Sequence, residues 1–115
     1  MLTSTSLTAL ADEHLAAARE ARGGRSAVTL HGGREHALRQ TLLALAAGHA
    51  LSEHESPGEA TLQVLRGTVT LTTPEETWRG SAGDHLAIPR ERHDLAAEDD
   101  AVVLLTVALD QAHED

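Results

Sequence analysis

The sequence contains no cysteine, which excludes a disulfide, a thiolate nucleophile and a thiolate metal site. Histidine and carboxylate side chains are then the remaining candidates for metal ligands, and the chain has eight histidines. Phenylalanine and tyrosine are also absent, and Trp78 is the single tryptophan. We therefore expect a core built almost entirely from Leu, Val and Ala side chains.

Lysine is absent as well, and nine arginines face 18 acidic residues, for a formal net charge of -9 at pH 7. Such a charge repels the backbone of nucleic acids and anionic lipid surfaces. No apolar run approaches the roughly 20 residues of a membrane-spanning helix. Residues 1–15 lack the positive flank and long apolar stretch of a signal peptide. We expect a cytoplasmic protein with neither nucleic acid nor membrane as a partner.

Apolar spacing predicts one helix followed by many short strands. From Leu7 to Ala21 the apolar residues recur at helical spacing, after a Ser/Thr stretch suited to capping. Beyond Gly24, short apolar runs alternate with glycine and proline, which is typical of a β-sandwich or barrel. The chain has the length of one domain. We expect a helix and connector over residues 1–25, a β-barrel over 26–110 and a tail over 111–115.

Two segments predict particular strand arrangements. Residues 61–71 place Leu62 and Val64 on one face and Val69 and Leu71 on another, around an Arg-Gly turn, which predicts a hairpin. Residues 102–109 are apolar on both faces, which predicts a strand covered on both sides by the helix or by a second subunit.

A third segment, residues 36–46, contains adjacent polar residues, Arg39 and Gln40. One of the two must point inward if the strand is regular, and a buried Arg or Gln would suggest an anionic or polar ligand. We interpret the segment instead as an edge strand.

Two further segments carry a recognisable motif spacing. Residues 48–67 read GHALSEHESPGEATLQVLRG and resemble the first cupin motif, G-x(5)-H-x-H-x(3,4)-E-x(6)-G, with every spacing kept. Residues 83–93 read GDHLAIPRERH and resemble the second motif, G-x(5)-P-x-G-x(2)-H. In the second, Gly83 and Pro89 match, Glu91 replaces the middle glycine and His93 comes one residue early. Ala97 stands where that motif ends in asparagine.

The resemblance extends over residues 27–109 and implies a small single-domain bacterial cupin. The implied fold class is all-β, an antiparallel cupin β-barrel (double-stranded β-helix or jelly roll), here with one N-terminal α-helix. In metal-binding cupins the two His of the first motif, its Glu and the His of the second motif hold a divalent ion inside the barrel. Mapped onto this chain, His54 and His93 are present, Ser56 replaces the second His and Ala60 replaces the Glu.

Two imidazoles alone form a weak, water-completed site, because a catalytic zinc site ordinarily takes three protein ligands. Glu59 adjoins the vacant carboxylate position. Strand side chains alternate, so we expect Glu59 to point away from Ala60 unless a bulge follows Pro57. We predict at most a weakly bound divalent metal (Zn, Ni, Fe or Mn) on His54 and His93, with Glu59 as the candidate third ligand.

Three functions remain open. The first is a sensor or stabilising module that binds a small molecule in the barrel, in a pocket bearing His54, Ser56, Ala60 and His93. The second is a metal-dependent enzyme of the dioxygenase, isomerase or decarboxylase type, which would need the third ligand. The third is a structural interaction domain whose barrel interior is filled, with ordinary interior histidines.

The resemblance also implies a homodimer. Leu42, Leu43 and Leu45, together with the two-faced strand at residues 102–109, favour this, because they offer more apolar surface than a small barrel is expected to hide alone.

Overall fold

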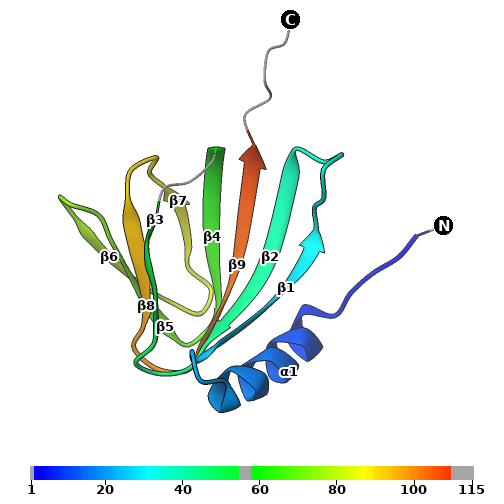
Figure 1. Cartoon of the computed structure of the whole chain (residues 1–115), viewed down its shortest axis with the longest axis horizontal. Helices are drawn as coiled ribbons and strands as arrows, with labels where there is room; N and C mark the ends of the chain where they lie inside the picture. Colours follow the sequence, from blue (N-terminus) through cyan, green and yellow to red (C-terminus); the bar gives the residue numbers. More distant parts are fainter. Residues whose placement is uncertain (1, 55–57, 110–115) are drawn as a thin grey trace, which may run out of the picture.

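The computed structural model of the chain describes residues 2–54 and 58–109, without the side chains of residues 53 and 54. Within these residues it contains one helix, α1 (Leu7–Glu20), and nine strands (Figure 1). The strands are β1 (Arg25–His31), β2 (Leu38–Leu45), β3 (Ala50–His54), β4 (Gly58–Arg66), β5 (Thr68–Thr72), β6 (Thr77–Ser81), β7 (His85–Ile88), β8 (His93–Ala97) and β9 (Ala101–Leu109).

The strands form two antiparallel sheets that face each other. The larger sheet has the order β1-β2-β9-β4-β7, and the smaller sheet has the order β3-β8-β5-β6. The apolar core between them is made by Leu43, Leu45, Ala60, Leu62, Val64, Val69, Leu71, Ile88, Leu95, Ala97, Ala101 and Val103. These are almost all Leu, Val and Ala, as expected from a chain without Phe or Tyr. The all-β fold with one N-terminal helix is confirmed.

Helix α1 packs on the outer face of the larger sheet. The Ser6 side chain caps it by accepting a hydrogen bond from the backbone N–H of Ala9, at 3.1 Å. Its buried face, Ala11, Leu15 and Ala18, packs against Leu42, Ala44 and Val102 of β2 and β9. The helix therefore begins at the predicted residue and ends one residue before the predicted one.

The two-faced strand at residues 102–109 is part of β9, and its inner and outer faces are covered in different ways. Val103 belongs to the core between the sheets, whereas Val102 lies under α1. Leu42, Leu43 and Leu45 are at most 5% exposed within one chain. A single chain thus buries Leu42, Leu43 and Leu45, whereas residues 104–109 of β9 stay partly buried or exposed.

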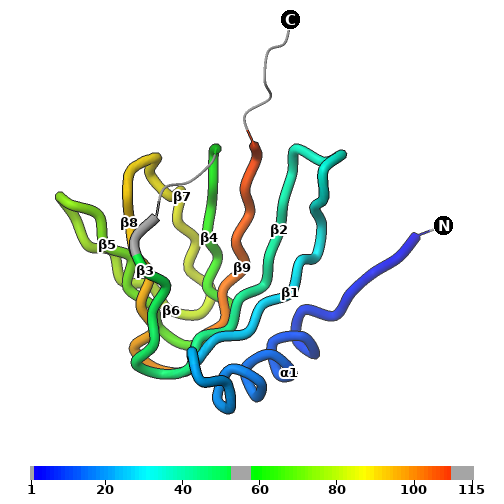
Figure 2. The backbone as a smooth tube through the Cα atoms, in the orientation of Figure 1, coloured from blue at the N-terminus to red at the C-terminus, as the bar shows by residue number. Residues whose placement is uncertain are grey.

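The expected hairpin over residues 61–71 is wrong in its pairing. Its two strands exist, but β4 belongs to the larger sheet and β5 to the smaller one, so the chain crosses between sheets at Gly67 (Figure 2). Leu62, Val64, Val69 and Leu71 consequently face one another in a single core. Gly67 has φ 75°, and a Cβ there would lie 2.2 Å from the carbonyl oxygen of Asp100, so the crossing needs glycine.

The edge-strand interpretation of residues 36–46 is also wrong. Strand β2 lies between β1 and β9, and it pairs with both over most of its length. Arg39 is opposite Val107 and Gln40 is opposite Thr106 in the β2–β9 register. Val107 packs against the core between the sheets, so Arg39 is the residue on the inner face.

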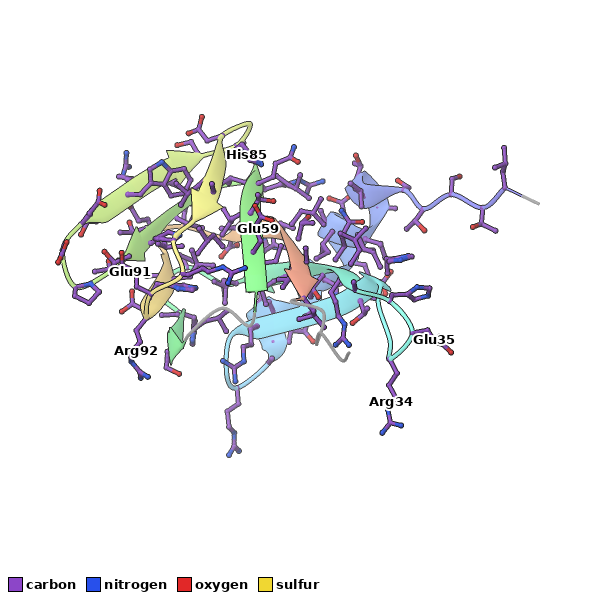
Figure 3. All side chains as sticks on the ribbon, turned by 90° about the horizontal axis from the view of Figure 1, so that it is seen from above. Arg34, Glu35, Glu59, His85, Glu91 and Arg92 are labelled. Atoms are coloured by element: carbon purple, nitrogen blue, oxygen red, sulfur yellow. The ribbon has the colours of Figure 1, made fainter. Side chains whose placement is uncertain are left out.

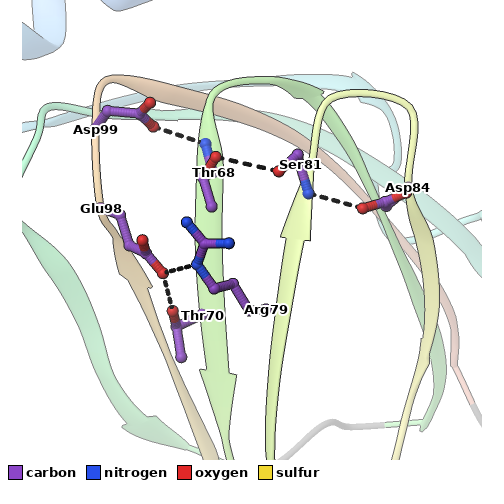
Figure 4. Close-up of polar contacts among 7 residues, drawn as sticks. All are labelled: Thr68, Thr70, Arg79, Ser81, Asp84, Glu98 and Asp99. Carbon is purple, nitrogen blue, oxygen red and sulfur yellow. Dashed lines mark hydrogen bonds and ion pairs between the residues drawn. The ribbon is translucent and has the colours of Figure 1, made fainter.

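Polar contacts join the turns at the end of the barrel where β4 meets β5 and β8 meets β9 (Figure 4). The Asp99 carboxylate accepts a hydrogen bond from the backbone N–H of Thr68, at 2.6 Å. The Glu98 carboxylate accepts hydrogen bonds from Arg79 Nε and from Thr70 Oγ1, both at 2.8 Å, and the Arg79 contact is the main cause of the lowered pKa of Glu98.

No helix in the described part of the chain is long and apolar enough to cross a membrane.

Candidate functional site

His93 is the candidate ligand whose surroundings the structure defines. It begins β8, is 3% exposed and belongs to the inner face of the smaller sheet. Its Nδ1 lies 2.8 Å from the carbonyl oxygen of Glu91. A carbonyl can only accept, so Nδ1 carries a proton and donates it to this hydrogen bond. Histidines that bind metals are commonly oriented by such a bond.

The cavity at His93 is small. It has a volume of about 20 Å³ and is walled by Leu51, Leu62, Leu71, Ile88, Leu95 and Leu105 besides His93 itself. Such a volume holds about one water molecule. The cavity that the described residues form beside the imidazole is therefore too small for an organic ligand.

The other residues expected at this site are only partly described. The backbones of His54 and His93 are paired across β3 and β8, after a register shift between Leu51 and His54. Two strands distant in sequence are thus brought together as predicted. The side chain of His54 and all of Ser56 lie outside the described residues.

Ala60 and Glu59 lie on opposite faces of β4. Ala60 is 5% exposed and belongs to the core, whereas Glu59 is exposed. Strand β4 pairs with β9 in regular register through these two residues, so no bulge turns Glu59 inward. Figure 3 looks down on the upper end of the barrel and marks Glu59 on this strand. Glu59 is not brought to His93, and the described residues contain no group of three side chains able to hold a metal ion.

A larger cavity lies where the edge strands of the two sheets, β6 and β7, meet. Its volume is about 270 Å³. We call it the seam cavity: its apolar walls are Leu71, Trp78, Leu86, Ala87 and Pro89, and its polar residues are Thr73, Glu76 and Thr77. Glu76, Thr77 and Ala87 are exposed, so the cavity opens to solvent.

Local geometry fixes the two sides of the seam cavity. Trp78 and Gly80 share one face of β6, and a Cβ on Gly80 would lie 2.1 Å from Cη2 of the indole. The ring therefore lies against the backbone of Gly80. At the β5–β6 turn, the Thr73 hydroxyl accepts from the backbone N–H groups of Glu75 and Glu76, at 3.3 and 3.1 Å, which holds the rim in place.

Leu71 lines both the seam cavity and the cavity at His93, so the two cavities are neighbours. Trp78 was not among the residues predicted for a site. A signal was present, because Trp78 is the single aromatic residue among Phe, Tyr and Trp and is followed two positions later by a glycine. That spacing leaves room for a large ring on one face of a strand.

No protein-family model and no curated protein matches the chain. A cupin superfamily protein from Desulfitobacterium hafniense matches 79% of this chain and 84% of its own, at 22% identity and a TM-score of 0.71. The chain has a cupin fold. The predicted resemblance is confirmed, although two of the four metal ligands of a metal-binding cupin are replaced.

Other solved structures with a similar fold differ widely in what their names describe. A conserved protein of unknown function from Streptococcus pyogenes is 28% identical over 80% of each chain, with a TM-score of 0.71. Salicylate 1,2-dioxygenase from Pseudaminobacter salicylatoxidans is 21% identical, with a TM-score of 0.72, over 87% of this chain. That match covers 33% of the enzyme's chain. These similarities describe the fold, and a shared fold does not assign a reaction.

Proposed function

We propose that this cupin binds a small molecule, and that the ligand occupies the seam cavity. The observation that supports the proposal is the cavity of about 270 Å³ between β6 and β7, whose walls are mainly apolar and include Trp78. Ligand sites are usually concave and apolar, with a few polar groups that fix orientation. Thr73, Glu76 and Thr77 are such polar groups at the rim.

The volume limits the ligand to a compact molecule. Drug-sized ligands fill pockets of roughly 300–1,000 Å³, whereas an apolar cavity of about 150 Å³ accepts benzene. A single ring with one polar substituent therefore suits the seam cavity, with the ring against Trp78 and the substituent at the open rim. The proposal assigns no reaction. The pocket predicted around His54, Ser56, Ala60 and His93 stays a prediction, as does a weakly held divalent ion there.

Benzyl alcohol is a suitable probe for the test. Trp78 is the single tryptophan of a chain without tyrosine, so its fluorescence reports on the seam cavity alone. We expect saturable changes in Trp78 emission as benzyl alcohol is added, and the same dissociation constant from calorimetry.

A matched pair of variants locates the binding site. Leu86→Phe adds volume inside the seam cavity and should abolish the response. Leu65→Phe is the control, because Leu65 is also partly buried but lines a different cavity, beside α1. Binding that persists in Leu86→Phe, or that is lost equally in both variants, contradicts the proposal.

A further inference from the structure

Arg39 presents a charged side chain to the inner face of β2. It is opposite Val107 of β9, and the neighbouring inner pair is Thr41 and Leu105. Leu105 and Val107 both pack against the core between the sheets. Side chains opposite each other in an antiparallel pair share a face, so the stem of Arg39 starts beside apolar side chains on the concave side of the sheet.

One nitrogen of the guanidinium is bonded and another is buried without a partner among the described residues. Nη2 donates a hydrogen bond to the carbonyl oxygen of Gly33, at 3.2 Å. The stem runs over Gly32, where an added Cβ would lie 3.6 Å from Cδ of Arg39. The Nε atom is buried and has no hydrogen-bond partner among the described residues. Within that part of the chain it is the single buried side-chain nitrogen or oxygen in this state.

A buried guanidinium N–H is a strong donor that cannot lose its proton, so an acceptor at Nε lowers the free energy of the folded protein. Carboxylates fit this role, because their two oxygens match two parallel N–H groups of arginine. A phosphate dianion fits less well in a chain of net charge -9, since one guanidinium leaves most of its charge unpaired.

We propose that Arg39 binds the carboxylate of a small organic acid, whose apolar part lies over Val107 and Leu105 on the inner face. This site is separate from the seam cavity, because β9 and β4 lie between β2 and β7 in the larger sheet. The inference goes beyond the proposed function and does not depend on it.

Calorimetry on the full chain carrying Leu86→Phe, in which the seam cavity is filled, tests the proposal with benzoate, benzamide and inorganic phosphate. Benzoate and benzamide share shape, but only benzoate is charged. A charge-assisted hydrogen bond favours benzoate by roughly tenfold or more in dissociation constant. Phosphate should bind more weakly than benzoate. Equal affinities for benzoate and benzamide, no benzoate binding, or tighter binding of phosphate would each overturn the proposal.

Variants then locate the anion. Arg39→Gln should lose the preference for benzoate, and Arg39→Lys should keep only part of it, because lysine lacks the planar pair of donors. Arg34→Gln is the control: it removes the same charge from the β1–β2 loop, where Arg34 is exposed and extends away from the sheets (Figure 3). It should keep benzoate binding within about twofold.

Two further results separate this site from the seam cavity. Benzoate should bind Leu86→Phe normally and leave Trp78 emission unchanged at concentrations that saturate Arg39. If benzoate affinity is unchanged in Arg39→Gln, the inference is wrong, whereas the benzyl alcohol experiment is unaffected by that outcome.

Discussion

Gly80→Ala is expected to move the Trp78 ring into the seam cavity. An alanine Cβ at this position would lie 2.1 Å from Cη2 and 2.4 Å from Cζ2 of the indole. Ordinary contacts begin at 3.4 Å, so the ring must retreat by about 1.3 Å. Gly80 has no positive φ, so the backbone itself accepts alanine.

The loss in free energy of unfolding depends on whether the indole ring has space to move. Overpacking a core typically costs about 1–3 kcal/mol, and the adjacent cavity lets the indole move, so we expect the lower part of that range. Urea denaturation measures the free energy of unfolding, and Trp78 emission measures the displacement. The displaced ring should shift its emission to longer wavelength and weaken benzyl alcohol binding, because it occupies the ligand's space.

Gly23→Ala is the matched control. Gly23 is exposed, has no positive φ and has nothing within 4 Å of an added Cβ, so its variant should change the free energy of unfolding by less than about 0.5 kcal/mol. If Gly80→Ala behaves like Gly23→Ala in stability, emission and binding, the indole does not lie against Gly80 and the reasoning fails.

Three further predictions concern the rest of the barrel. Gly67→Ala should lower the free energy of unfolding, measured by urea denaturation, by about 2–4 kcal/mol. Gly48→Ala should lower it less, because both glycines have positive φ but of the two only Gly67 has backbone atoms close to the added Cβ. Equal losses in the two variants would contradict the steric explanation. The pKa of Asp100 is lowered by the Ala47 backbone N–H and then by Arg19, so its stabilisation is present above the unfolded pKa near 3.8 and is lost as pH falls through the lower folded value. Stability measured against pH should therefore fall below about pH 4, and less steeply in Asp100→Asn; identical slopes would contradict this. Micromolar zinc should raise the melting temperature by only a few degrees, because the described residues contain no group of three side chains that could hold the ion. A shift above about 10 °C would instead show a complete metal site.

Local patterns in the sequence were sufficient for the elements and for the fold. The α1 boundaries follow from capping and helical spacing, and the cupin resemblance follows from two motifs in the right order. The face of Glu59 also followed from strand alternation, because β4 is regular at that point.

Pairing over long sequence distances was not predictable in the same way. Strands β4 and β5 are joined by one glycine, as in a hairpin, yet they belong to different sheets: β4 pairs with β7 and β9, and β5 pairs with β6 and β8. Arg39 was assigned to an edge for the same reason: β9, its neighbour, begins more than 60 residues later. The seam cavity lies among three consecutive strands, β5, β6 and β7, but β7 belongs to the larger sheet, so their arrangement depends on the crossing between sheets that the sequence did not predict.

A crystal structure of the protein soaked with benzyl alcohol tests the central claim most directly. We predict ligand density in the seam cavity, with the ring between Trp78 and Leu86 and the hydroxyl toward Thr77. Ligand density at another site, with the indole and Leu86 in direct contact and no space between them, would contradict the account.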